Sequence, residues 1–577
     1  MFKTFFACLT AITLAGCSTI PAEPARSAAT GASSAVDVAG SVSAADPRAQ
    51  AAGEAMLAKG GSATDAAIAV MLALTVVEPQ SSGIGGGGFL VRGTANGEVT
   101  SFDGRESAPL GADPQWFVGE DGELRPYAET VRSGLSVGVP GNLAMAAMAH
   151  REHGRLPWTD LFDPARQLAK EGFLINRRLH ESLDGSLDRA GLTQAGRAMF
   201  YTPDGQPKPV GTRITNPALD DVFAAVAKIG PNAFYLVPMA AELAGTVRRA
   251  TPREGGMGIA DVVGYEPKER PSVCGFYRQY KICGMGPPSS GGIAVLQILM
   301  QLERFDLAAS GVDNPATWHL FLESQRLAYA DRELYLADSD FVPVPVGGLI
   351  DPAYVTRRGL LIDPMRALDS VSAGSPMGAA QTLADGDEPV ENGTSHFAIV
   401  DARGTMVSYT STIEGPFGSG LMFGGFYLNN ELTDFSRSPE VDGVLVANRV
   451  EGGKRPRSSM APTVIYAPDG TPFAAIGAAG GSTIPVQTAR SIVGLIDFGL
   501  PIEEALALPL IMAFGDRVVV EEGTWMANRT DAFEQFGHTQ IIARAPPLKA
   551  GAVWWNGERW IAARDPRLDG LLEYAPE

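Results

Sequence analysis

The chain has 577 residues, of which 46 are basic and 65 acidic, so its formal net charge is −19. A surface this acidic repels phosphate groups and argues against nucleic acid as a partner. The length is sufficient for several domains. Charged residues make up only 19% of the chain and glycine is abundant, with 67 residues, a composition that suits closely packed layers.

The N-terminus is typical of an exported bacterial lipoprotein. Lys3 precedes a mostly apolar stretch at residues 5–16, which is too short to span a bilayer but right for a signal peptide. It ends in Leu-Ala-Gly-Cys, a lipobox-like sequence, so we expect residues 1–16 to be removed and Cys17 to be lipidated. An ordinary secretory signal with an incidental cysteine is the alternative. Serine at position 18 indicates export to the outer membrane.

A flexible tether is expected to follow Cys17. Residues 19–46 are rich in Ala, Ser, Pro and Gly, and a chain of this kind reaches roughly 30 Å on average. We therefore assign residues 17–46 to a lipid-anchored tether. The expected location is the periplasmic side of the outer membrane, with the lipid as the only contact with the membrane.

The next segments are interpreted as structural. The almost wholly apolar run from Ala66 to Val77 predicts a buried core helix. Four glycines at 85–88 lack the Gly-Lys-Ser/Thr ending and the GxGxxG pattern of phosphate loops, so close backbone packing is expected. His150 and His153 have no third ligand nearby, and we expect a solvated helix face and no metal.

Two cysteines remain downstream, Cys274 and Cys283. A two-residue turn at Arg278–Gln279 would place them opposite each other at a non-hydrogen-bonded position, with Cα atoms about 4.5 Å apart. That separation permits a disulfide, and an oxidising periplasm favours it. Two free, buried thiols are the alternative.

Thr394 lies where a loop ends and an alternating strand begins, in Glu-Asn-Gly-Thr-Ser-His-Phe. If the Gly393–Thr394 bond breaks, this residue carries both a hydroxyl nucleophile and its own amine. An α-amino group has a pKa of about 7.7–8.0, so no separate histidine base is required. His396 is therefore expected only to pack locally. The alternative is an ordinary strand threonine.

The residues that follow strengthen the first interpretation. Residues 400–406 predict a three-residue hairpin loop with glycine at its third position. In that register Thr412 faces Thr394, and its hydroxyl would lie within hydrogen-bonding range. Farther on, residues 476–483 close a strand and open a helix, where Gly480 and Gly481 offer backbone N–H groups to an oxyanion. A plain strand-to-helix turn is the alternative for these glycines.

Together these segments resemble the γ-glutamyltransferase (γ-glutamyl transpeptidase) family of N-terminal nucleophile hydrolases. The resemblance runs from about Pro47 to the C-terminus. Besides the segments around Thr394 and Gly480, its landmarks follow in the family's order at residues 60–67, 79–89, 102–109, 138–141, 287–292, 328–332, 428–436 and 455–462.

The resemblance implies roles for individual residues. Thr394 would be the autoprocessing and catalytic nucleophile after cleavage at Gly393, Thr412 its hydroxyl partner, and Gly480 and Gly481 the oxyanion hole.

The donor site is implied in the same way. Arg105, with Ser458 and Ser459, would hold the donor's α-carboxylate, and Glu431 and Asp434 its α-amino group. These residue types suit a zwitterion, because a guanidinium can bind its carboxylate while neighbouring carboxylates bind its ammonium.

The sequence differs from the family's pattern at two places in the donor site. Glu414 stands where the family's familiar members carry an asparagine. This third carboxylate could strengthen ammonium binding, repel the α-carboxylate, or shift preference toward another acyl group. Residues 437–454 correspond to the family's lid over the donor, yet contain no tyrosine and look shortened.

The implied fold is an αββα sandwich, an α/β arrangement built from two autoproteolytic chains, residues 47–393 and 394–577, which form a heterodimer. No cofactor and no metal are expected. The implied activity transfers a γ-glutamyl group, from glutathione or a relative, to water, an amino acid or a peptide. One alternative is an acylase on the same scaffold that removes a glutaryl group from a cephalosporin, with Glu414 as its motivation. The other is a non-catalytic surface-binding lipoprotein.

Overall fold

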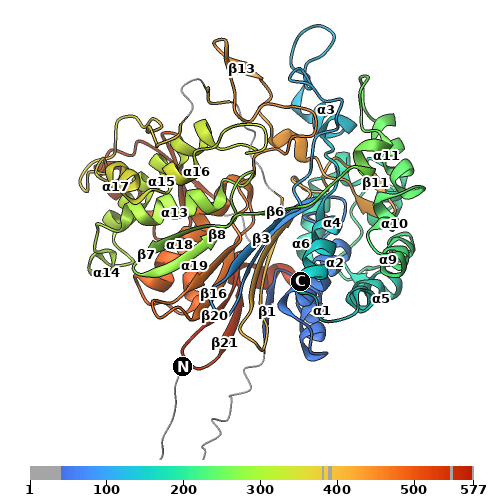
Figure 1. Ribbon diagram of the computed structural model, residues 1–577, viewed down its shortest axis with the longest axis horizontal. Helices are drawn as coiled ribbons and strands as arrows, with labels where there is room; N and C mark the ends of the chain where they lie inside the picture. Colours follow the sequence, from blue (N-terminus) through green and yellow to red (C-terminus); the bar gives the residue numbers. More distant parts are fainter. Residues whose placement is uncertain (1–39, 380–382, 387–392, 546–549, 575–577) are drawn as a thin grey trace, which may run out of the picture. The chain divides into compact units, whose positions relative to one another are not determined.

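Two six-stranded antiparallel sheets lie face to face at the centre of the computed structural model, which describes residues 40–379, 383–386, 393–545 and 550–574 (Figure 1). The first sheet has the order β1 (Ser41–Ala44), β9 (Ser395–Val400), β10 (Met406–Thr412), β2 (Gly87–Gly93), β3 (Val99–Asp103), β6 (Lys268–Arg270). The second has the order β21 (Trp560–Arg564), β20 (Gly551–Trp555), β16 (Pro472–Gly477), β15 (Thr463–Tyr466), β8 (Tyr280–Gly284), β7 (Val273–Tyr277).

Helices cover both outer faces of the sheet pair (Figure 1). The layer on the first sheet contains α1 (Pro47–Ala58), α2 (Ala63–Val77), α4 (Asn142–His153), α5 (Asp163–Glu171) and α9 (Pro217–Ile229). The layer on the second sheet contains α13 (Gly291–Leu302), α15 (Pro315–Tyr335), α18 (Ile484–Ile496) and α19 (Ile502–Ala507). The expected αββα sandwich is confirmed.

Shorter elements surround these four layers. The helices are α3 (Tyr127–Val131), α6 (Arg177–Asp184), α7 (Leu187–Ala190), α8 (Gln194–Phe200), α10 (Asn232–Tyr235), α11 (Met239–Arg249), α12 (Ile259–Val263), α14 (Leu307–Ser310), α16 (Val346–Leu349), α17 (Pro352–Gly359) and α20 (Thr530–Gln535). The strands are β4 (Phe173–Leu174), β5 (Arg213–Ile214), β11 (Met422–Phe423), β12 (Phe426–Tyr427), β13 (Glu440–Val441), β14 (Val444–Leu445), β17 (Ile511–Phe514), β18 (Arg517–Glu521) and β19 (Gln540–Arg544).

The hairpin β9–β10 has the predicted register. Ser395 pairs with Ser411, which brings Thr394 opposite Thr412 one step beyond the strand. The loop closes through a hydrogen bond from the Gly404 amide to the Asp401 carbonyl at 2.9 Å. Gly404 has a φ of +76°, the left-handed conformation for which glycine is favoured. Strand β9 lies between β1 and β10, so Thr394 begins an interior strand of the sheet.

The glycines at 85–88 pack against backbone, as expected. A Cβ on Gly85 would lie 2.0 Å from the Tyr427 carbonyl oxygen, and one on Gly86 would lie 2.0 Å from that of Thr412. No side chain fits at such distances, so these glycines allow the 85–88 segment to lie directly against the end of β10. The predicted core helix is α2, in which every residue is buried.

The disulfide between Cys274 and Cys283 is present in the hairpin β7–β8, where the two residues are paired with Cα atoms 4.1 Å apart. The turn residues Arg278 and Gln279 have φ values of +47° and +70°. Two left-handed residues in a two-residue loop match the right-handed twist of the strands on either side.

Two expectations need correction. Residues 41–44 were assigned to the flexible tether, but they form β1, which pairs with β9. The alternation of polar and apolar side chains in these four residues is too weak to predict a strand. They form one because their backbone pairs with β9. His150 and His153 do not lie on a solvated face, since their side chains are only 18% and 21% exposed. The ring of His150 bonds to the Leu156 carbonyl at 2.9 Å.

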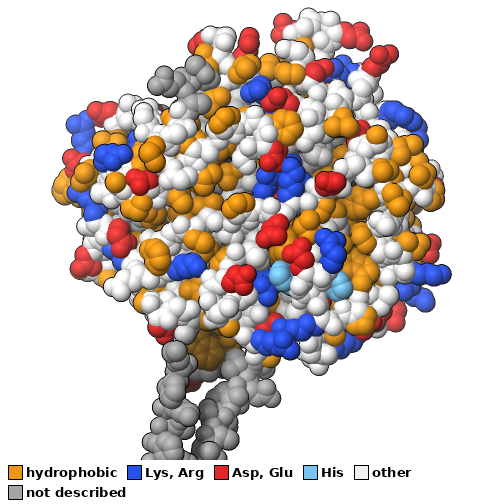
Figure 2. Space-filling view, in the orientation of Figure 1, with side chains coloured by type: hydrophobic (Ala, Val, Ile, Leu, Met, Phe, Trp, Pro, Cys, Tyr) orange, Lys and Arg blue, Asp and Glu red, His pale blue; other side chains and the backbone are white. Residues whose placement is uncertain are grey.

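The N-terminal predictions lie largely outside the described residues. The signal peptide, Cys17 and the tether up to residue 39 belong to that part of the chain. Within the described ranges, no helix has both the length and the apolar character needed to cross a bilayer. On the face drawn in Figure 2, acidic and basic side chains lie interspersed.

Candidate active site

Thr394 occupies a strained position at the start of β9. Its φ is +107°, a region that a β-branched residue avoids because of steric clashes. Its side chain is buried, and its hydroxyl donates to the Thr412 hydroxyl at 3.1 Å. The Thr394 amide donates to the Ser81 carbonyl at 3.1 Å. The hydroxyl and the backbone nitrogen of Thr394 are therefore both held by specific partners.

The residue before it has no room for a side chain. A Cβ on Gly393 would lie 1.4 Å from the carbonyl oxygen of Glu414. Glu414 itself has a left-handed φ of +71°, and its amide donates to the Thr412 hydroxyl oxygen at 2.8 Å. The turn after β10 thus presses against the Gly393–Thr394 peptide and also fixes Thr412.

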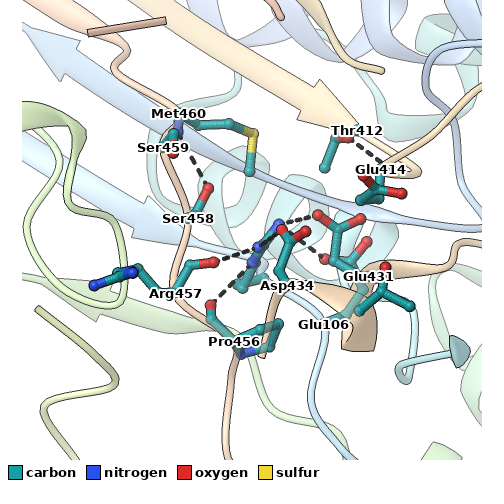
Figure 3. Close-up of polar contacts among 12 residues, drawn as sticks. Glu106, Thr412, Glu414, Glu431, Asp434, Pro456, Arg457, Ser458, Ser459 and Met460 are labelled. Atoms are coloured by element: carbon teal, nitrogen blue, oxygen red, sulfur yellow. Dashed lines mark hydrogen bonds and ion pairs between the residues drawn. The ribbon is translucent and has the colours of Figure 1, made fainter. Parts of the chain in front are cut away.

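Arg105 follows β3 and is almost fully buried. Its guanidinium forms ion pairs with Glu431 and Asp434. It also donates to the carbonyls of Pro456, at 3.2 Å, and Arg457, at 2.8 Å. Figure 3 shows these groups converging on one guanidinium, with Thr412 and Glu414 alongside. Segments that are far apart in the sequence therefore meet at this buried guanidinium.

A small cavity joins the arginine, the acids and the threonines. Its lining residues are Arg105, Thr394, Thr412, Glu414, Glu431, Asp434, Ser458 and Met460. Among these described residues Arg105 is the one cation, against three carboxylates. Burial raises the pKa of Asp434 well above its usual range and also raises that of Glu414. The cavity therefore has an excess of buried carboxylate and attracts a cation or a proton.

Two residues at the rim of this cluster were not singled out from the sequence. Asn430 donates to the Glu414 carboxylate and accepts from the Gly415 amide at 3.0 Å. Arg189 donates to the Asn430 side chain at 3.2 Å, and its charge opposes the rise in the pKa of Glu414. Asn430 lies inside the segment 428–436, which could have indicated it. Arg189 lies on α7, far away in the chain, with no local signal.

A further acid was also missed. Glu106 is fully buried beside Arg105, at 4.0 Å between their charged atoms, and burial raises its pKa to about 8. Its position directly after Arg105 in the 102–109 segment was the available signal. Tyr127 on α3 faces the same acids, and burial together with the Glu414 charge raises its pKa.

Not every predicted site residue lines the cavity. Within the described chain, Ser458 does so, whereas the Ser459 hydroxyl accepts from Arg332 at 2.7 Å. Gly480 and Gly481 lie outside the lining, in the turn between β16 and α18, with φ values of +121° and +58°. A 3-10 turn at Gly481–Thr483, which begins with the second of these glycines, precedes the α-helix.

The histidine near the site, His396, has a structural role. His396 is buried, with its ring bonded to the Thr410 hydroxyl at 2.9 Å, and burial lowers its pKa to about 3. Its expected local packing is confirmed.

One group with metal-ligating side chains occurs elsewhere among the described residues: His319, Glu323 and His538. The two rings bond to each other at 2.9 Å, and Glu323 accepts from Arg326 and from the Leu368 amide, both at 2.8 Å. The protein itself therefore supplies partners for this group.

The fold and the site define a class. An αββα sandwich with a buried threonine at the head of an interior strand, beside an arginine–carboxylate cluster, is the arrangement of an N-terminal nucleophile hydrolase. More specifically, the chain belongs to the gamma-glutamyltranspeptidase family, whose model matches residues 49–574.

Individual relatives agree with this membership. The chain is 37% identical over 481 residues to a glutathione hydrolase proenzyme of Bacillus subtilis strain 168, covering 82% of this chain and 80% of that one. It is 35% identical over 479 residues to the protein of the same name in Escherichia coli K12, covering 82% and 80%. A cephalosporin acylase from Bacillus halodurans superposes with a TM-score of 0.78 at 26% identity, over 92% of this chain and 94% of that one.

Proposed function

We propose that this protein is a γ-glutamyltransferase and glutathione hydrolase, with Thr394 as its nucleophile. The observation that carries this proposal is the shared cavity, in which the Thr394 hydroxyl, one arginine and three carboxylates all take part. A γ-glutamyl group ends in an α-carboxylate and an α-ammonium. Arg105 suits the first, and Glu431, Asp434 and Glu414 suit the second.

The first stage is cleavage of the chain by its own threonine. Thr394 Oγ attacks the Gly393 carbonyl, an ester forms as the peptide C–N bond breaks, and the proton passes to the released amine. Water then hydrolyses the ester and leaves Thr394 at a new N-terminus. The positive φ of Thr394 supports this stage, because such a conformation stores on the order of 1–3 kcal/mol. The two products, ending at Gly393 and beginning at Thr394, form the mature heterodimer.

The second stage is acyl transfer. The free amine of Thr394 takes the proton from its own Oγ, which attacks the γ-amide carbonyl of the donor. The Gly480 and Gly481 amides stabilise the oxyanion, and the proton passes to the leaving amine. The resulting γ-glutamyl ester is released to water, an amino acid or a peptide. The 3.1 Å contact with Thr412 orients Oγ for both stages.

The acylase alternative has support from the fold of the Bacillus halodurans neighbour. The charges of the cavity favour the γ-glutamyl donor instead. A glutaryl group has the terminal carboxylate but not the ammonium, so it would add a negative charge beside Glu414, Glu431 and Asp434 without the positive charge that a γ-glutamyl group brings. We therefore interpret Glu414 as a third partner of the ammonium.

One preparation tests both stages. The protein without residues 1–16 is purified and analysed by intact mass and N-terminal sequencing, with Thr394→Ala as the control. We expect a fragment beginning Thr-Ser-His-Phe from the first protein and a whole chain from the variant. The processed enzyme should release the amine from γ-glutamyl anilide and not from glutaryl anilide. An intact chain identical to the variant would favour the non-catalytic binding protein, and the reverse anilide preference would favour the acylase.

We also propose that the enzyme is anchored to the outer membrane through lipid on Cys17. The lipobox-like residues 14–17 and the serine at 18 support this, and burial of acyl chains contributes about 0.8 kcal/mol per methylene. Radiolabelled palmitate should appear in the full-length protein and not in Cys17→Ala. Label retained by the variant would reject the anchor.

A further inference from the structure

The cluster of His319, Glu323 and His538 has the side chains and the burial of a metal site. His319 and Glu323 are 0% exposed and His538 is 4% exposed. One ring nitrogen or carboxylate oxygen from each residue lies within 4.8 Å of those from the other two. Among the described residues, the cluster shares no member with the cavity that contains Thr394. Two imidazoles and a carboxylate form a ligand set that Zn²⁺ accepts.

Helix α15 supplies two of the three side chains. His319 and Glu323 are four residues apart on this helix, so they lie on the same face. His538 follows α20, 219 positions after His319. The ring of Phe536 stacks on that of His319, with the ring centroids 4.4 Å apart. No local sequence motif indicates the cluster, because its third member comes from a distant segment.

The hydrogen bonds of His319 orient it as a metal ligand. Its Nε2 bonds to the Asp363 carbonyl at 2.9 Å. A carbonyl only accepts, so Nε2 carries the proton of the neutral ring and Nδ1 carries the lone pair. Metal-bound histidines almost always donate their second ring N–H to a carbonyl, a carboxylate or water in this way. The lone pair of Nδ1 points toward His538 Nε2, which lies 2.9 Å away.

The Glu323 carboxylate can bind a cation without losing its hydrogen bonds. One oxygen accepts from Arg326 and the other from the Leu368 amide, both at 2.8 Å. A carboxylate oxygen has two lone pairs, so one remains on each oxygen. The positive charge of Arg326 is offset by Asp516, which contacts it at 2.8 Å. Repulsion between this arginine and a bound cation is therefore reduced.

The distances require only small movements. In a tetrahedral zinc site with bonds of about 2.0–2.1 Å, neighbouring ligand atoms lie about 3.3 Å apart. The two ring nitrogens, now 2.9 Å apart, would separate by about 0.4 Å to reach that spacing. No other pair within the 4.8 Å limit would have to close by more than about 1.5 Å.

We propose that His319, Glu323 and His538 form a structural binding site for a divalent transition metal ion of the zinc type. The ion takes the lone pair of His319 Nδ1. The proton on His538 Nε2 moves to Nδ1 of the same ring, which frees a second lone pair, and a water fills the fourth position.

The site lies across the proposed cleavage point. His319 and Glu323 belong to residues 47–393 and His538 belongs to residues 394–577, so a bound ion would connect the two cleavage products. Binding of the ion itself does not depend on the proposed function. Only the linking role does.

A zinc titration tests the site. The protein without residues 1–16 is freed of metal with a chelator, desalted, and titrated with Zn²⁺ in competition with a chromogenic chelator. We expect one zinc ion per chain with a Kd below about 1 μM, weaker than four-ligand structural sites. His538→Asn should weaken binding at least about 100-fold, since loss of a second-shell partner alone costs about 10- to 100-fold.

His180→Asn is the matched control. This histidine is half-buried on α6, where its ring bonds to the Lys208 carbonyl at 3.0 Å, and it is not a member of the cluster. Its zinc affinity should stay within twofold of that of the unsubstituted protein. Zinc should also raise the Tm of the unsubstituted protein and of this control, and should leave that of His538→Asn unchanged.

X-ray absorption at the zinc edge covers the case in which His538→Asn fails to fold. The unsubstituted protein with one equivalent of zinc should show nitrogen and oxygen ligands at about 2.0–2.2 Å and the outer-shell scattering of two imidazoles.

Three results would overturn the inference: no zinc bound at micromolar concentrations, equal affinity in His538→Asn and the unsubstituted protein, or a spectrum without imidazole. The two rings would then form a hydrogen-bonded pair and nothing more. Failure of the proposed function is distinguishable from all three, because it abolishes release of amine from γ-glutamyl anilide and leaves the zinc titration unchanged.

Discussion

Glu414→Gln isolates the charge that separates the γ-glutamyl donor from its glutaryl analogue. The Glu414 side chain is only 5% exposed, and its carboxylate accepts a hydrogen bond from Asn430. Glutamine can keep that bond and the same volume, so the substitution removes a charge without opening a space. A hydrogen bond to a charged group contributes about 1.5–3 kcal/mol and a neutral one about 0.5–1.5 kcal/mol. The difference, about 1–1.5 kcal/mol, corresponds to about a 5- to 12-fold rise in KM for a γ-glutamyl anilide.

The assay measures kcat and KM for γ-glutamyl and glutaryl anilides between pH 6 and 8.5. Glutaryl turnover should improve in the variant, because one like charge is removed from beside its carboxylate. Burial raises the pKa of Glu414, so the wild-type side chain becomes neutral at a higher pH than a free glutamate does, and the difference between the two enzymes should narrow as the pH falls. Glu504→Gln on the exposed face of α19 is the matched control. An unchanged γ-glutamyl KM at pH 8.5 would refute the assignment of Glu414 to the ammonium.

Four further predictions concern cleavage, turnover and stability. Gly393→Ala should slow autocleavage at least about 100-fold on denaturing gels, because its Cβ would lie 1.4 Å from the Glu414 carbonyl oxygen and must displace the scissile peptide; normal cleavage would contradict this. Thr412→Val, which removes the 3.1 Å contact with Thr394, should lower kcat by about 3- to 10-fold, the effect of one hydrogen bond, and an unchanged kcat would reject that role. Replacing both Cys274 and Cys283 by serine should cost about 2–3 kcal/mol in the free energy of unfolding, from loop entropy alone, measured by urea denaturation against Ser272→Ala. Burial lowers the pKa of His396 to about 3, whereas the imidazole in the unfolded chain takes up a proton below about pH 6.5. The free energy of unfolding should therefore decrease as the pH falls from 6.5 toward 3, and His396→Asn should make this decrease smaller.

Features encoded by neighbouring residues were predictable from the sequence. The register that pairs Thr394 with Thr412 depends on one glycine in a short loop, and the Cys274–Cys283 disulfide depends on one two-residue turn. Both hairpins follow from local turn geometry and strand alternation. The core helix α2 has an apolar sequence long enough to be recognised alone.

Features created by distant contacts were not predictable from local pattern. Arg105 reads as a surface residue until β3 brings it to Glu431 and Asp434, more than three hundred positions later. Arg189 reaches Asn430 only because α7 packs against the segment after β10. Strand β1 likewise has too weak an alternation to be recognised without its partner β9. For Arg105 it was the family resemblance that indicated a role, and the structure supplies the charges that surround it.

In the cleavage proposed above, the hydrogen bond from Thr394 to Ser81 connects the precursor with the mature enzyme. Before cleavage the Thr394 amide donates to the Ser81 carbonyl at 3.1 Å. After cleavage the same nitrogen is an amine, which can still donate one N–H to that carbonyl while its lone pair turns toward its own Oγ. The amide of Ile413, next to Thr412, donates to the same carbonyl at 3.4 Å. One carbonyl oxygen therefore aligns the start of β9 with the end of β10. The geometry that brings Thr394 Oγ to its own peptide bond is then the geometry that keeps the new base beside the nucleophile.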